Sequence, residues 1–210
     1  MTQSKSAYQR FIDSMRIDYE KWHDGVGYDL EALPALSPEE RRNLVAILRG
    51  RGDWRDAEAL QRLAELGEAS AGEVVQEIID DPGGPIEQRL MAMEDLRAAG
   101  AMSDEELERR LLPALKVAAP YGGITPALRL VQQVPTERIK RRLLWGVLHH
   151  PQAGVHYAAM LAFICGKAES DFDWNLRPLF LRTRSNDPAE RKQAVAELCQ
   201  LIGMNPSDAE

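Results

Sequence analysis

The chain has 210 residues and a net charge of −7, and its 44% hydrophobic and 28% charged residues are typical of a globular protein with a sizeable core. Its two cysteines, Cys165 and Cys199, are too few for a disulfide framework or a cysteine-based zinc site. The longest apolar run, residues 158–165, is too short to cross a bilayer, and the charged N-terminal stretch lacks the apolar core of a signal peptide. We therefore expect a cytoplasmic protein that does not enter a membrane.

The first 35 residues differ from the rest of the chain. An amphipathic helix is expected over residues 4–22, and the stretch KWHDGVGYDLEALPAL that follows contains two glycines and a proline, which are typical of a loop. Segments at the end of a helical array are usually atypical because they cover the exposed end of the core. We interpret residues 1–35 as an N-terminal cap helix and loop.

Beyond residue 35, helix start signals are frequent, whereas strand and hairpin signals are nearly absent. The patterns SPEE at Ser37, SAGE at Ser70, SDEE at Ser103 and DPAE at Asp187 each place a capping side chain three residues before a glutamate. Thr125-Pro126 and Pro135-Thr136 mark two further starts, and Asp53 fits an N-cap. We expect helices at residues 38–49, 54–66, 71–80, 85–99, 104–119, 125–134, 137–149, 152–166, 172–183 and 188–202.

Two of these segments contain a proline inside the helical pattern, Pro113 and Pro178. Proline lacks an N–H group and its ring clashes with the preceding turn, so we expect a kink or a break at both positions. The predicted fold class is all-α.

A sequence pattern recurs along the chain. DPAERKQAVAEL at residues 187–198 is similar to GPIEQRLMAMEDL at residues 84–96, and HPQAGVHYAAMLAF at residues 150–163 is a weaker copy. The spacing corresponds to units of roughly 33–37 residues. The matching positions are Arg89, Ala92 and Leu96; His156, Ala159 and Phe163; and Arg191, Ala194 and Leu198. We predict one domain, residues 1–210, built as an α-solenoid of helical hairpins, with an irregular helical bundle as the alternative.

The order Asp-Pro, Arg, Ala and Leu resembles the HEAT family of helical repeats. The resemblance is clearest at residues 187–198, weaker at 81–96 and 150–163, and poor before residue 60. It implies stacked helix pairs with an extended surface for binding other proteins. HEAT-like hydroxylases carry His-Glu dipeptides as iron ligands, and this sequence contains none.

The sequence contains no recognisable catalytic motif. There is no HExxH, no phosphate-binding loop and no GxSxG, and the four histidines have no partner at a metal-ligand spacing. We expect no enzyme activity, no cofactor and no metal. The basic residues around 138–142 leave nucleic-acid binding open, as in HEAT-like DNA glycosylases, although a solvated face that balances nearby carboxylates is the simpler interpretation.

Charge is unevenly distributed along the chain. Residues 1–105 hold 12 Lys and Arg and 22 Asp and Glu, a net charge of −10, whereas residues 106–210 hold 14 and 11, a net charge of +3. Residues 63–88 contain no basic residue. Such a field repels nucleic acid and attracts basic proteins, unless it serves only solubility.

Three tryptophans lie beside acids, in EKWHD, GDWRD and DFDW, and an aromatic ring flanked by carboxylates is a suitable anchor for a protein partner. Such a ring can also simply hold a helix end against its neighbour. The predicted partner-binding residues are Trp22, Asp24, Tyr28, Asp29, Asp53, Trp54, Asp56, Glu73, Glu77, Asp80, Asp81, Asp171, Asp173 and Trp174.

The stretches YDLEALPALSPEERR and GDWRDAEAL resemble immunity proteins of bacterial type VI secretion and polymorphic toxin systems, over about residues 20–65. This resemblance implies a cognate protein toxin whose active site is blocked. An acidic inhibitor suits a basic toxin such as a nuclease. A general HEAT-like adaptor and a HEAT-like enzyme are the alternatives.

Overall fold

In the computed structural model, residues 5–16, 18–150, 152–171 and 173–209 are described, without the side chain of Trp22. These residues form helices and connecting loops with no strand, so the predicted all-α class is confirmed for them. None of the described helices is long and apolar enough to cross a membrane.

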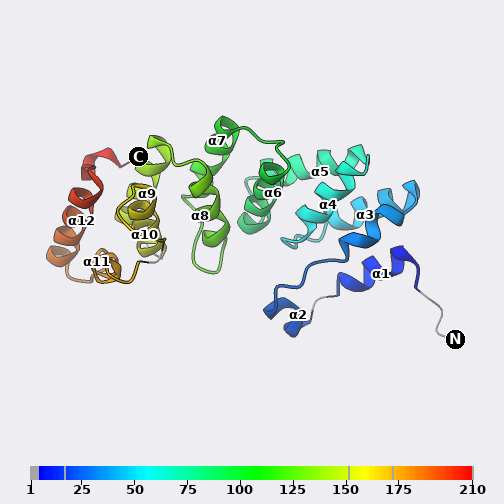
Figure 1. Ribbon diagram of the computed structural model, residues 1–210, viewed down its shortest axis with the longest axis horizontal. Helices are drawn as coiled ribbons and strands as arrows, with labels where there is room; N and C mark the ends of the chain where they lie inside the picture. The colour runs from blue at the N-terminus through cyan, green and yellow to red at the C-terminus, as the bar shows by residue number, and fades with distance from the viewer. Residues whose placement is uncertain (1–4, 17, 151, 172, 210) are drawn as a thin grey trace. The chain divides into compact units, whose positions relative to one another are not determined.

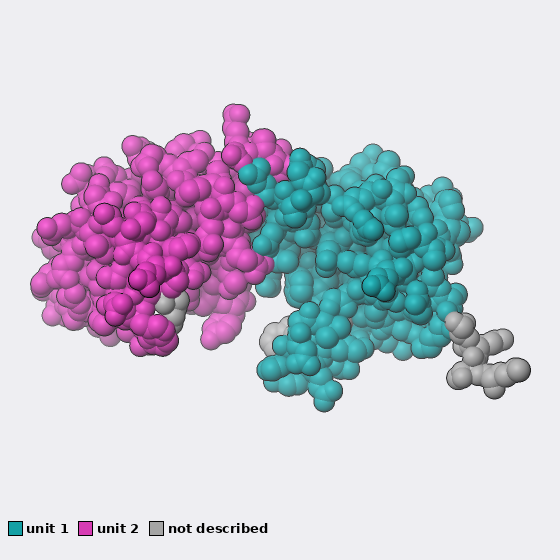
Figure 2. All heavy atoms as spheres, in the orientation of Figure 1, with its two compact units in different colours: residues 1–101 teal, residues 102–210 magenta. Residues whose placement is uncertain are grey.

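The chain divides into two compact units, residues 1–101 and residues 102–210 (Figure 2). This boundary lies close to the change in charge. Residues 1–101 hold 12 Lys and Arg and 20 Asp and Glu, a net charge of −8, whereas residues 102–210 hold 14 and 13, a net charge of +1. The acidic character of the protein therefore belongs almost wholly to unit 1.

Unit 1 is organised around α4. This helix contacts α3, α5, α6 and the 3₁₀ helix η1; α3 also contacts α5, and α1 packs on η1 (Figure 1). Buried aliphatic side chains fill these contacts, and each such side chain stabilises the fold by about 1.5–3 kcal/mol. The elements are α1 (Ala7–Ser14), α2 (Tyr19–His23), η1 (Leu30–Ala35), α3 (Pro38–Arg49), α4 (Asp56–Glu65), α5 (Ala69–Asp80) and α6 (Ile86–Ala98).

Unit 2 is organised around α10, which contacts α8, α9, α11 and α12. The closest approach between α9 and α10 is at Gly146, where an added Cβ would lie 2.0 Å from Cδ2 of the buried Tyr157 ring. Glycine is therefore required for this packing. The elements are α7 (Asp104–Ala114), α8 (Ile124–Gln133), α9 (Glu137–His149), α10 (Gly154–Ile164), α11 (Arg177–Arg182), α12 (Pro188–Ile202) and η2 (Pro206–Asp208).

Several predicted helix caps are confirmed. Ser37 accepts a hydrogen bond from the Glu40 backbone N–H, and the Glu40 carboxylate accepts one from the Ser37 backbone, which completes the capping box. Ser103, Thr136 and Asp187 also accept from the first turns of their helices. Each cap satisfies a backbone donor that the helix itself leaves unpaired.

Three predicted starts are wrong. α5 begins at Ala69, so Ser70 lies inside the helix and its hydroxyl donates to Glu68 instead. α8 begins at Ile124 behind Gly123, whose left-handed backbone (φ 82°) sets the turn in place of Thr125. α4 begins at Asp56 with Arg55 at the N-cap position, because the Asp53 carboxylate accepts from the Arg55 backbone in a tighter turn before the helix.

The helix expected over residues 4–22 is two helices. Ser6 caps α1, which ends at Ser14, and the Asp18 carboxylate accepts from the Lys21 backbone at the start of α2. Local capping by aspartate competes with a continuous helix, which explains the interruption.

The two prolines mark helix ends. Pro113 lies in the last turn of α7, so the predicted extension to residue 119 does not form. Pro178 lies in the first turn of α11, where its missing N–H has no cost, and the helix spans only residues 177–182.

Candidate functional site

One side of α5 in unit 1 carries a row of exposed carboxylates. Glu73, Glu77 and Asp80 occupy positions i, i+4 and i+7 and therefore share a face, opposite the buried side chains of Val75 and Ile79. Asp81, also exposed, follows directly. We call Glu73, Glu77, Asp80 and Asp81 the acidic edge. The structure thus brings four predicted partner-binding residues onto one helix and its end.

Arg49 at the end of α3 partly neutralises this edge. Its Nε donates to Oε2 of Glu77 at 3.0 Å, and both side chains are 56% exposed, so solvent weakens the pair. Arg49, Glu77 and Asp81 line a cavity of about 320 Å³. A partner with several cationic groups can compete for Glu77 at small cost because the existing ion pair is exposed.

The segment before α4 holds Trp54 over an arginine. The guanidinium of Arg55 lies 4.6 Å from the centroid of the Trp54 ring, and its Nη1 donates to both oxygens of Asp53, at 2.9 and 3.2 Å. Asp53 and Trp54 are half-buried and line a second cavity of about 250 Å³ with Glu87 and Gln88. Both predicted residues therefore lie at an accessible edge of unit 1.

Asp56 and Tyr28, also predicted as partner contacts, are buried instead. The Tyr28 hydroxyl donates to Asp56 Oδ1, and the Asp53 backbone N–H donates to Oδ2 at 2.8 Å. Burial raises the pKa of Asp56, and these two hydrogen bonds and Arg51 oppose that shift. Burial also raises the pKa of Tyr28. In this structure the pair faces the core and holds the segment that carries Trp54.

The remaining predicted residues of unit 1 belong to its first 35 residues. Asp24 is exposed and lies 3.2 Å from the ring of its neighbour His23. Asp29 is half-buried, and its carboxylate lies 3.8 Å from Nε of Arg10. The backbone of Trp22 is part of α2, but its side chain lies outside the described part of the structure.

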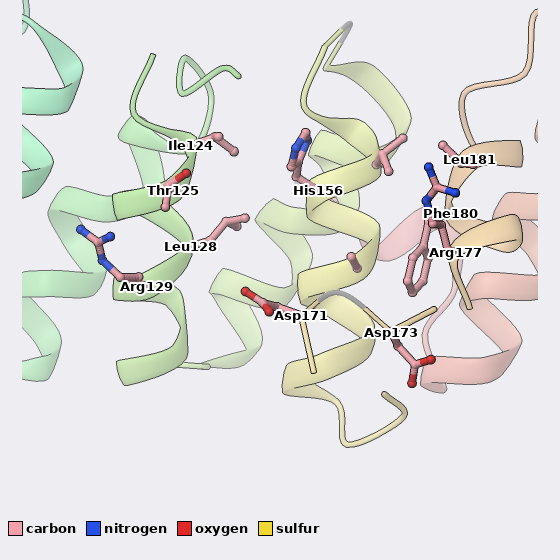
Figure 3. A pocket seen from close by; sticks show the side chains of 12 residues that line it. Ile124, Thr125, Leu128, Arg129, His156, Asp171, Asp173, Arg177, Phe180 and Leu181 are labelled. Carbon is pink, nitrogen blue, oxygen red and sulfur yellow. The ribbon is translucent and has the colours of Figure 1, made fainter. Parts of the chain in front are cut away.

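Unit 2 contains a cavity of about 400 Å³ between α8, α10 and α11 (Figure 3). Apolar side chains from all three helices line it, among them Leu128, Ala159 and Phe180. Charged side chains lie at its margin, and Figure 3 shows the Arg129 guanidinium pointing away from α10. The polar lining residues are Thr125, Arg129, His156, Asp171, Asp173 and Arg177.

Two of the three predicted residues between positions 171 and 174 line this cavity. Asp171 and Asp173 line it, whereas Phe172 falls outside the described residues. The Asp173 carboxylate accepts from the backbone N–H groups of Glu169 and Asn175, which lower its pKa. Trp174 is 69% exposed, and the Arg177 guanidinium lies 5.3 Å from its ring centroid. Asp173 therefore shapes the turn, and the Trp174 ring beside it is largely exposed to solvent.

Three basic side chains of unit 2 pair with carboxylates. Arg138 lies 3.1 Å from Glu108, Lys140 lies 2.7 Å from Glu137, and Arg110 lies 3.0 Å from Glu106. Ion pairs of this kind are those expected of a face that balances nearby acids.

Sequence reasoning missed Asp95. Burial raises its pKa to about 7, with Glu58 and Glu94 adding to the shift, and its Oδ2 has no hydrogen-bond partner. Asp95 lines a cavity of about 280 Å³ together with Glu58 and Glu65. The available signal was its position directly before Leu96, a core residue of α6, which places it at the margin of the buried face.

Among the described residues, no group of three or more His, Cys, Asp or Glu side chains could hold a metal ion. His150 is a core histidine at the end of α9, where its Nδ1 accepts from the Ala153 backbone at 3.0 Å. Burial and the nearby Arg184 lower its pKa.

Comparison of the chain with protein-family models, curated proteins and solved structures finds no match. The function of the acidic edge and of the cavities must therefore be inferred from the chemistry of their residues.

Proposed function

We propose that this chain is a protein-binding immunity protein, which neutralises a cognate basic antibacterial toxin, in the first instance a nuclease, by occluding its active site. The observation that carries the proposal is the acidic edge: four carboxylates exposed on one helix and its end, within a stretch that contains no basic residue from 63 to 88. A localised negative field of this kind steers a cationic partner and accelerates association.

The neighbouring Trp54 supports the same function. Tryptophan and arginine dominate the binding energy of protein interfaces when they lie at the centre of a contact. Trp54 is half-buried and fixed by Arg55 and Asp53, so little side-chain entropy is lost when a partner covers it. The exposed carboxylates of the acidic edge can take the places of substrate phosphates in a nuclease site.

The proposal includes a HEAT-like solenoid as the architecture. In unit 1, α4 contacts both α5 and α6, and in unit 2, α10 contacts both α11 and α12. Contacts of a helix with the next helix and the one after it are typical of stacked hairpins. The repeated small residues Ala92 and Ala194 are fully buried, as the repeat pattern predicts.

Co-expression with the product of the adjacent reading frame tests this function. The expected result is a stable one-to-one complex and survival of cells that the adjacent product alone would kill. A broad set of weakly bound partners would favour the adaptor alternative. DNA binding that weakens with salt, without any protein partner, would contradict the proposal and favour the enzyme alternative.

A further inference from the structure

Unit 2 contains a further cavity, of about 370 Å³, which is lined by the end of α9, one face of α12 and the 3₁₀ helix η2. Its volume is within the range of roughly 300–1,000 Å³ that is usual for small-molecule sites. Leu148 is half-buried, and Pro188, Ala196 and Pro206 are exposed. Apolar surface in this cavity is therefore accessible to a ligand.

Every charged side chain that lines this cavity in the described part of the chain is basic. Arg191 and Lys192 are both exposed, and neither side chain forms a hydrogen bond or an ion pair with another described residue. The remaining polar lining residue is His149, whose ring is neutral or positive. The cavity between α8, α10 and α11, in contrast, is lined by two arginines and two aspartates. The cavity at α12 therefore has a net positive charge and favours an anion.

The helical period explains why the charges and the apolar surface lie together. Five residues of α12 share the face that lines the cavity, at positions i, i+3, i+4, i+7 and i+8: Pro188, Arg191, Lys192, Val195 and Ala196. The two cations precede the exposed Ala196 by about one turn, or roughly 6 Å along the helix axis. A ligand on this face would have its anionic group at the cations and an apolar part of about that length beside Ala196.

The acids nearest in sequence form other bonds. The Asp187 carboxylate accepts from the backbone N–H of Ala189 at 2.9 Å, and the Glu190 carboxylate accepts from the Ser185 hydroxyl. Neither acid is among the residues that line the cavity. The two cations on this face therefore have no acidic partner among the described residues.

We propose that this cavity binds a small apolar carboxylate, whose carboxylate group contacts Arg191 and Lys192 and whose apolar part contacts Leu148 and Ala196. A guanidinium group can donate two parallel hydrogen bonds to a carboxylate, and an ammonium group adds a second positive charge. The apolar part adds affinity because its surface is removed from water. This site lies in unit 2, so it is independent of the acidic edge of unit 1 and goes beyond the proposed function.

The test is a titration of the full chain with 3-phenylpropanoate at constant ionic strength, followed through the methyl resonances of ¹³C-labelled alanine. The expected result is a saturable shift of the Ala196 methyl group with a Kd below about 1 mM. The methyl group of Ala159, which lines the cavity between α8, α10 and α11, should not shift. The uncharged 3-phenylpropanamide should bind at least about tenfold more weakly, and acetate, which has no ring, should not saturate at about 10 mM.

A pair of double variants separates the site from the general charge of unit 2. R191Q/K192Q removes both cations at exposed positions and should weaken binding at least about tenfold. R109Q/K167Q makes the same charge change at exposed positions outside the cavity and should leave the Kd within about twofold.

Equal binding of the acid and the amide, or an unchanged Kd in R191Q/K192Q, would overturn the proposal. A shift of Ala159 in place of Ala196, or no saturation with 3-phenylpropanoate, would do the same. Acetate that binds as tightly as 3-phenylpropanoate would also contradict it, because the apolar part would then contribute nothing.

Discussion

The hydroxyl group of Tyr28 donates a hydrogen bond of 2.9 Å to Oδ1 of Asp56, and both side chains are buried. The bond joins the loop before η1 to the first residue of α4, 28 residues further along the chain. The same carboxylate accepts from the Asp53 backbone through Oδ2. The conformation of the segment that presents Trp54 therefore depends on one buried carboxylate.

Removing the hydroxyl should weaken unit 1. In Y28F, Asp56 loses its only side-chain hydroxyl donor among the described residues while it stays buried, so the free energy of unfolding should fall by about 1–3 kcal/mol. Urea denaturation measures this change. Y121F is the matched control because Tyr121 is fully exposed, and its stability should stay within about 0.5 kcal/mol of the parent. Equal stabilities for the two variants would show that the bond contributes nothing.

The contact of α9 with α10 should not tolerate a methyl group. In G146A the new Cβ would lie 2.0 Å from the Tyr157 ring, which is held by the hydrogen bond from its hydroxyl to the Leu115 carbonyl at 2.6 Å. We expect a loss of about 3 kcal/mol or more in the free energy of unfolding.

Gly72 provides the control, since it lies in α5 and its added Cβ would meet only Ala64 at an ordinary 3.8 Å. G72A should be neutral or stabilising by up to about 1 kcal/mol, because alanine is the better helix former. Thermal unfolding of both variants distinguishes the outcomes, and a G146A protein as stable as G72A would refute the close packing.

Because of Asp95, the free energy of unfolding should depend on pH in the range up to about neutrality. Its folded-state pKa of about 7 lies above the unfolded value, so between about pH 4 and pH 7 only the folded state keeps the proton. Stability is then highest at the acidic end of this window and falls as the pH rises through 7.

The variant D95N should remove this loss of stability at high pH, because asparagine does not ionise. At pH 8 it should exceed the parent in the free energy of unfolding by roughly 1–2 kcal/mol, a value reduced from the full shift because solvent screens a half-buried group. Denaturation at pH 5 and pH 8 measures the difference, and E39Q in the exposed first turn of α3 controls for removing a charge. A stability difference that does not change with pH would contradict the assigned environment of Asp95.

Helix positions were largely predictable from local sequence because capping is a local interaction. The bounds of α3, α9 and α12 follow from Ser37, Thr136 and Asp187, whose side chains act within three residues. The errors arose where a different local hydrogen bond formed. The Asp53 carboxylate, for example, accepts from the Arg55 backbone in the turn before α4.

The candidate site was predictable only in part. The acidic edge follows from helical spacing, since Glu73, Glu77 and Asp80 share a face in any α-helix. The burial of Asp56 was not predictable, because it depends on Tyr28 from a distant segment. The burial of Nε and Nη2 of Arg55 was not predictable either, because it depends on the packing of residues 52–55 against the start of α6.

The most direct test of the account is the association rate with the cognate basic partner, measured at several salt concentrations. The double variant E73K/D80K reverses two charges of the acidic edge, and E31K/E39K makes the same charge change at exposed positions of η1 and α3. We predict that E73K/D80K slows association at low salt at least tenfold and flattens its salt dependence, whereas E31K/E39K slows it less than about threefold. Equal slowing by the two double variants would contradict the claim that the acidic edge is the binding surface.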